Sequence, residues 1–192
     1  MILGVDPGYA KCGWSVVDAL GRVKALGVIL TTQDPGVKKK TVALSTDRMR
    51  RVSDVGAVLA ARAKDYGCTM IAAEQALQHG AAAAIAANLL PWGALTTLAT
   101  MTGMRLVEIT AKTWQHAVLG LEAGAVDYET LEKELSAYVD CQSAVGFDAI
   151  KKALRTHAVD AVGVGLLAAL RPHLANVIVA ARTLHVERKE CA

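Results

Sequence analysis

The sequence lacks paired cysteines. Its four cysteines, Cys12, Cys68, Cys141 and Cys191, are scattered along 192 residues, and no two of them form a C-x-x-C pair. Neither a disulfide framework nor a zinc site is therefore indicated, and a reducing cytosol is the expected location. The N-terminus also lacks the basic region, apolar core and small-residue cleavage site of a signal peptide, which agrees with a cytoplasmic protein.

A strong net charge is also missing. Lys and Arg exceed Asp and Glu by three, which permits a nucleic-acid partner but does not indicate binding driven by a highly basic surface or tail. We find no internal repeat and no linker long enough to divide the chain, so residues 1–192 are expected to form a single domain around one core. Residues 172–192 could form a C-terminal extension of that domain.

Residues 75–104 contain no Asp, Glu, Lys or Arg. A stretch of that length could span a membrane. It is, however, rich in alanine and interrupted by Pro91, Gly93 and several polar residues, whereas membrane spans are rich in Leu, Ile and Phe. We therefore expect no membrane association, and we expect this helix to be buried in the domain or in a subunit interface, because a helix that is apolar on all sides must be covered.

Short segments rich in β-branched residues predict the strands. The first three are separated by turns that contain glycine, which is typical of an antiparallel meander. Two later segments are separated by helical sequence, which is typical of parallel strands. The predicted strands are residues 2–6, 13–18, 23–31, 69–74 and 105–110. This order predicts an α/β fold with a mixed five-stranded sheet, three antiparallel strands and then parallel ones, flanked by helices.

Helical spacing of apolar residues predicts the helices around this sheet. They are expected at residues 46–66, about 80–101, 112–119, about 127–139 and about 157–170. Ser45, Thr46 or Asp47 is the expected N-cap of the first of them. Pro91 is expected to kink the alanine-rich helix at 80–101, because proline cannot donate the backbone hydrogen bond that a helix interior requires.

Three acidic residues lie where strand ends and helix starts should meet, which is where chemistry gathers in such sheets. Asp6 ends the first strand, Glu74 ends the fourth, and Asp160 is expected in the first turn of the last helix, on the same face as His157. One such acid alone is more often a turn or capping residue. Together, crowded carboxylates need a cation, and oxygen ligands suit Mg²⁺ or Mn²⁺, two of which can hydrolyse a phosphodiester.

Four ordered segments carry a family resemblance. They are ILGVDPGYAKCGWSVVD at the start, IAAEQ with Gly93 downstream, VEIT followed by residues 112–120, and HAVDAVGVGLLAAL in the last helix. They resemble the RuvC family of Holliday junction resolvases over about residues 2–119 and 157–170. The resemblance implies a ribonuclease H-like fold and two Mg²⁺ ions, replaceable by Mn²⁺. The implied catalytic metal ligands are Asp6, Glu74, His157 and Asp160, since the family has Asp or His at the third position.

The sequence departs from the family at two positions. Leu77 stands where the family usually has an aromatic wedge for the junction crossover, and an apolar wedge can open base steps but cannot stack on them. Gln115 or His116, with Lys112 close by, stands where a lysine is expected. Residues 121–156 and 172–192 match poorly. These departures indicate a divergent member, for which a viral origin is one explanation.

Basic residues are the other candidates for DNA contact. Lys151, Lys152 and Arg155 immediately precede the two ligands of the last helix, so they are expected beside the scissile phosphate. With Leu77, Lys112 and Gln115, they make up the predicted DNA-binding residues. A second basic run comprises Lys38, Lys39, Lys40, Arg48, Arg50 and Arg51. For that run, a solvated face is as good an interpretation as a DNA contact.

The expected function is a structure-selective DNA endonuclease that resolves four-way junctions. A junction has two symmetry-related strands to cut, so a homodimer is expected, paired through the helix at 80–101. Two alternatives remain open. One is a ribonuclease H-like nuclease of the YqgF type that processes RNA, and the other is a non-catalytic architectural protein that binds junctions.

Overall fold

The computed structural model describes residues 1–75, 82–120, 127–140, 146–174 and 176–177. A mixed sheet runs through its middle, in the strand order β3-β2-β1-β4-β5-β6. The first three strands pair antiparallel, and β4 and β5 are parallel to β1. The strands are β1 (Ile2–Asp6), β2 (Lys11–Val17), β3 (Val23–Leu30), β4 (Met70–Glu74) and β5 (Arg105–Ile109). The predicted five-stranded mixed sheet is therefore confirmed. The sixth strand, β6 (Asn176–Val177), pairs antiparallel with β5 and was not predicted, because two residues carry no alternation pattern.

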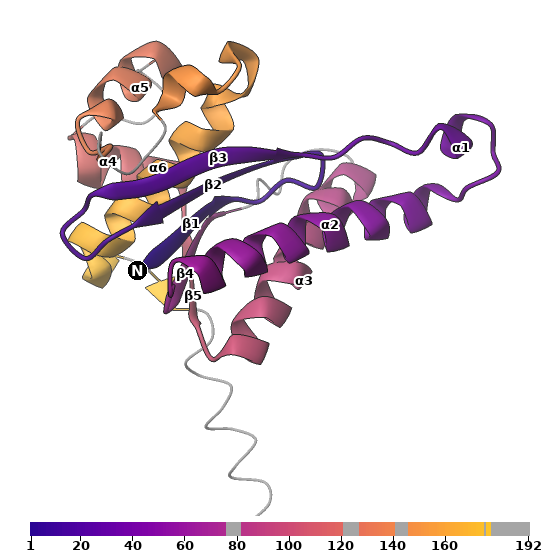
Figure 1. Ribbon diagram of the computed structural model, residues 1–192, viewed down its shortest axis with the longest axis horizontal. Coiled ribbons are helices and arrows are strands. Elements are labelled where there is room, and N and C mark those ends of the chain that lie inside the picture. The colour runs from indigo at the N-terminus through magenta and orange to yellow at the C-terminus, as the bar shows by residue number, and fades with distance from the viewer. Residues whose placement is uncertain (76–81, 121–126, 141–145, 175, 178–192) are drawn as a thin grey trace, which may run out of the picture.

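Helices cover both faces of the sheet (Figure 1). Two pack on one face and three on the other, each layer over its own cluster of buried aliphatic side chains. The first face carries α2 (Leu44–Asp65) and α3 (Ala82–Thr102), and the second carries α4 (Ala111–Leu119), α5 (Tyr128–Ser136) and α6 (Arg155–Leu170). The remaining helical segments are short: α1 (Pro35–Lys38) and three 3₁₀ turns, η1 (Phe147–Ala149), η2 (Lys152–Leu154) and η3 (Pro172–Leu174).

Helix α6 lies directly against β1 and β2, and glycines make this approach possible. A Cβ atom on Gly13 would lie 1.8 Å from the backbone oxygen of His157, and one on Gly4 would lie 2.1 Å from that of Ala161. The buried hydroxyl of Ser15 donates a hydrogen bond of 2.8 Å to the same Ala161 oxygen. These contacts fix the first half of α6 over the end of β1.

Two expectations about helix starts were wrong. Helix α2 begins after Ala43, which has no polar side chain to form a capping bond, so Ser45, Thr46 and Asp47 lie inside the helix. The buried carboxylate of Asp47 accepts from Asp34 and Arg50 instead. Helix α6 begins at Arg155, since the 3₁₀ turn η2 leads straight into it. Asp160 therefore lies in the second turn of α6 and not in the first. The alanine-rich helix α3 continues through Pro91.

One described segment, Lys152–Leu170, is long and apolar enough to cross a membrane by length and composition, although 61% of it is buried in the structure. It contains α6, whose residues Ala158–Ala168 are all buried. The core helix of a soluble protein meets the same criteria, so we attach no membrane role to it.

Candidate active site

Asp6 and His157 meet where the end of β1 faces the start of α6. Nδ1 of His157 lies 2.6 Å from Oδ2 of Asp6. This hydrogen bond raises the pKa of His157, while partial burial and the nearby charge of Lys11 act in the opposite direction. The pairing with Asp6 therefore favours the charged form of His157.

Two further carboxylates crowd the same place. Glu74 ends β4, which pairs with β1 up to Val5 and Ala73, so it lies beside Asp6. Burial, and then the charges of Asp160 and Asp6, raise the pKa of Glu74 to about 9. Burial, and then Asp6, raise the pKa of Asp160 to about 7. The three acids that the sequence places at strand ends and on the last helix are thus brought together by the fold.

Trp114 forms part of the floor of this site. Its side chain is fully buried in the core. Its indole N–H faces Glu74 and lowers the pKa of that carboxyl slightly, although the two groups do not reach hydrogen-bonding geometry. The indole therefore offsets only a small part of the repulsion among the acids.

The chemistry of these donors fits a hard divalent cation. In the described part of the chain, no lysine or arginine forms an ion pair with Asp6, Glu74 or Asp160. Crowded carboxylates without such a partner retain protons unless a cation neutralises them, and carboxylate oxygens are the ligands that Mg²⁺ and Mn²⁺ prefer. Among the described residues, no three His, Cys, Asp or Glu side chains are already arranged around one ion position.

Tyr128 is a site residue that the sequence did not reveal. Its hydroxyl lies 3.1 Å from both carboxylate oxygens of Asp160 and can donate its single proton to either of them. It is the first residue of α5, which is capped by Asp127, whose side chain accepts from the backbone N–H of Thr130. The cap predicts where α5 begins, but no local pattern indicates that its first residue reaches a carboxylate on α6.

Two of the three predicted DNA-binding cations near the start of α6 form ion pairs with carboxylates on α5. Lys152 Nζ lies 2.6 Å from a carboxylate oxygen of Glu129, and Arg155 lies 2.8 Å from one of Glu132. Both pairs join α5 to the entry of α6. The Lys152 pair is largely exposed and adds little stability, so contact of these cations with DNA stays a prediction. Lys151 and Lys152 are both exposed, whereas Arg155 is half-buried.

The other predicted DNA-binding residues differ in exposure. Lys112 on α4 is exposed and Gln115 is half-buried. Leu77, the candidate wedge, lies outside the described residues.

Comparison with known proteins identifies a matching family. The family model described as crossover junction endodeoxyribonuclease RuvC matches residues 2–130, a span that contains Asp6 and Glu74 but ends before His157 and Asp160. No curated protein is similar enough in sequence to match the chain.

Two solved structures share the fold. Thermus thermophilus RuvC in complex with a Holliday junction substrate has a TM-score of 0.67 and 19% identity, covering 92% of this chain and 98% of that one. The Thermus thermophilus RuvC structure has the same TM-score and identity, covering 92% of this chain and 99% of that one. The family match over two thirds of the sequence, together with the fold, establishes that this chain belongs to the RuvC family.

Proposed function

We propose that this protein is a metal-dependent endonuclease that resolves four-way DNA junctions in a reducing cytosol. The observation that carries the proposal is the meeting of Asp6, Glu74 and Asp160, from β1, β4 and α6, without a lysine or arginine partner among the described residues. Membership of the RuvC family, and a related structure solved with a Holliday junction substrate, give the class of substrate.

The mechanism follows from what these side chains can hold. Two Mg²⁺ ions bound by Asp6, Glu74, His157 and Asp160 would activate a water molecule and stabilise the leaving oxygen, with no covalent intermediate. His157 would then bind through an unprotonated ring nitrogen, so a doubly protonated ring would have to give up one of its two ring protons. Glu74 and Asp160 must lose their protons as well, so loading the site releases protons.

Tyr128 acts in this mechanism as a positioning residue. Its hydroxyl can donate to one oxygen of Asp160 and leave the other free, which orients the carboxylate and favours its charged form. Partners of this kind, one shell outside the ligands, typically change metal affinity by about 10–100-fold.

Tyr128→Phe should therefore weaken Mn²⁺ binding by about 10–100-fold in calorimetry on the DNA-free protein. Cleavage should fall at low metal concentration and recover as the concentration rises. Tyr138→Phe is the matched control, because Tyr138 follows the same helix and packs against the core. Unchanged Mn²⁺ affinity with a lowered melting temperature would reduce Tyr128 to a packing role.

A homodimer paired through α3 is also part of the proposal. An apolar groove runs between α2 and α3, and it includes exposed side chains on both helices. Met101 is 81% exposed, Met49 55% and Leu89 47%. Exposed apolar surface gathered in one groove is typical of an interface.

Met101→Asp should weaken dimerisation at least about tenfold in sedimentation velocity, because a charge would be buried at the interface. Leu20→Asp is the matched control, since Leu20 is 73% exposed in the turn between β2 and β3. A wild-type chain that stays monomeric at high concentration, or a Met101→Asp variant that dimerises normally, would contradict pairing through this groove.

A cleavage assay tests the function. The substrates are a labelled four-way junction, a duplex of the same sequence and a structured RNA, each with Mg²⁺ and with a chelator. We expect rapid cutting of the junction with Mg²⁺ only. Faster cutting of the RNA would favour the YqgF-type alternative, and tight junction binding without cutting would favour the architectural one.

A further inference from the structure

We infer that residues 31–43 form a basic arm that grips the phosphate backbone of a duplex arm of the junction. The arm leaves the end of β3, carries α1 at its tip and returns into α2, and it projects well beyond the sheet (Figure 1). The inference rests on the proposed function, because it names how branched DNA is held.

The arm begins at the catalytic edge of the sheet. Strands β1 and β3 both pair antiparallel with β2, so their ends lie at the same edge. Thr31, the first residue of the arm, donates its backbone N–H to the oxygen of Ala10 over 3.0 Å, and its hydroxyl donates to the oxygen of Tyr9. Tyr9 and Ala10 follow Asp6 in the turn between β1 and β2. A duplex that enters the site is therefore close to the base of the arm.

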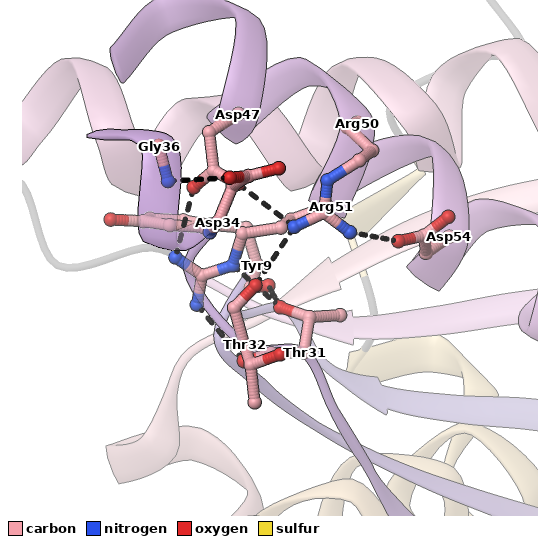
Figure 2. A network of polar contacts seen from close by, with 9 residues as sticks. All are labelled: Tyr9, Thr31, Thr32, Asp34, Gly36, Asp47, Arg50, Arg51 and Asp54. Atoms are coloured by element: carbon pink, nitrogen blue, oxygen red, sulfur yellow. Dashed lines mark hydrogen bonds and ion pairs between the residues drawn. The ribbon is translucent and has the colours of Figure 1, made fainter. Parts of the chain in front are cut away.

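A polar network holds the base of the arm in one position (Figure 2). Its centre is the buried carboxylate of Asp47, which accepts the backbone N–H of Asp34 over 3.0 Å and a guanidinium N–H of Arg50 over 2.8 Å. Arg50 also donates to the backbone oxygen of Thr32 over 2.8 Å. These bonds join the segment between β3 and α1 to the first turns of α2.

Arg51 completes the network. Its Nε donates to the hydroxyl of Thr31 over 2.7 Å, and its guanidinium lies 4.7 Å from the centre of the Tyr9 ring. Arg50 and Arg51 thus form hydrogen bonds within the protein. For these two residues of the second basic run, we assign a structural role in place of a DNA contact. They build the arm, and the lysines at its tip carry the charge that it presents.

The tip is closed by backbone bonds and presents three lysines. The oxygen of Gly36 accepts the backbone N–H groups of Thr41 over 2.9 Å and Val42 over 3.2 Å. This turn sets Lys40 at a φ of 58°, a left-handed conformation that is uncommon for lysine.

Lys38, Lys39 and Lys40 are all exposed, and no described carboxylate forms an ion pair with them. No acidic residue occurs between Asp34 and Asp47. The tip is therefore uniformly cationic, and its partner must be anionic.

Duplex DNA is the partner that this arrangement fits. It carries regularly spaced phosphates, and each phosphate neutralised by a lysine adds about 0.9 to the slope of log K against log salt. A braced arm also presents its charges without the ordering cost that a flexible tail pays on binding. Phosphate contacts position a protein on DNA without reading its sequence, so the arm should act on a junction arm and on plain duplex alike.

The test is a salt titration of binding, done without Mg²⁺ so that no cutting occurs. The variant Lys38→Gln, Lys39→Gln, Lys40→Gln is compared with a control of equal charge change, Lys64→Gln, Arg105→Gln, Arg171→Gln. The control positions are exposed and lie toward the opposite edge of the sheet, at the end of α2, the start of β5 and the end of α6.

The arm variant should show a slope that is shallower by about 2–3 on junction and on duplex, which corresponds to about tenfold or greater loss of affinity at low salt. The control should keep the wild-type slope. A wild-type slope in the arm variant would overturn the proposal, and so would a loss confined to the junction, which would place the lysines at the branch point. Wild-type junction cleavage, measured in parallel, tests the proposed function separately.

Discussion

Asp6→Asn, Glu74→Gln and Asp160→Asn, each introduced alone, should lower the rate of junction cleavage by about 10³-fold or more while junction binding is retained. Each change removes one anionic ligand from a crowded site that has few others. A bound metal ion supplies several kcal/mol of transition-state stabilisation, and each 1.4 kcal/mol is a factor of ten in rate. Binding should persist, because the substitutions remove negative charge that repels phosphate.

Single-turnover cleavage of a labelled junction at saturating enzyme measures this loss without interference from binding. Asp65→Asn is the matched control, since that carboxylate is exposed in the last residue of α2, which lies near the start of β1 and not near the end that carries Asp6. A variant of Asp6, Glu74 or Asp160 that cut at a near-native rate in Mg²⁺ would remove that residue from the set of ligands.

Glu74→Gln should also make the metal-free protein more stable, most strongly above neutral pH. Burial and the neighbouring acids raise the pKa of Glu74 from 4.5 to about 9 in the folded chain. Between these two values, the unfolded chain ionises this residue and the folded chain does not. The contribution of Glu74 to the free energy of unfolding is therefore at its most favourable below about pH 4.5, and this contribution is lost as the pH rises toward 9. Glutamine cannot ionise, so the variant escapes this loss.

Thermal unfolding with a chelator present measures the effect. The melting temperature of Glu74→Gln should exceed that of the wild type by at least about 5 °C near pH 8, since each kcal/mol raises the melting temperature of a chain of this size by about 2–4 °C. The difference should shrink near pH 5. With saturating Mn²⁺ it should shrink or reverse, because ion binding stabilises only the protein that binds the ion. Equal melting temperatures across this pH range would show that Glu74 is not held in a repulsive environment.

The sheet and the acids could be predicted because each rests on a local pattern. Alternation and glycine turns define β1 to β3, and an acid at the end of a buried strand lies where strand ends meet. Asp6 and Glu74 are of this kind. His157 and Asp160 followed from the family resemblance and their spacing on one helix face, and the structure places both beside Asp6.

Contacts between distant segments could not be predicted in the same way. Tyr128 and Asp160 are 32 residues apart, and their meeting depends on how α5 packs on α6. The same packing pairs Lys152 and Arg155 with carboxylates on α5, and no local sequence pattern indicates these two ion pairs. Likewise, the sequence offers Asp47 as a helix N-cap, but its carboxylate accepts hydrogen bonds from Asp34 and Arg50 at the base of the arm.

Calorimetric titration of Mn²⁺ into the DNA-free wild-type protein and into Asp160→Asn tests most directly whether these side chains form a metal centre. The wild type should bind up to two ions per chain and release protons as it does so, because His157, Glu74 and Asp160 must all be deprotonated to coordinate. Asp160→Asn should bind at least about tenfold more weakly and release fewer protons. Identical titrations for the two proteins, or a wild type that binds no ion yet cuts junctions in a chelator, would contradict a metal centre at Asp6, Glu74, His157 and Asp160.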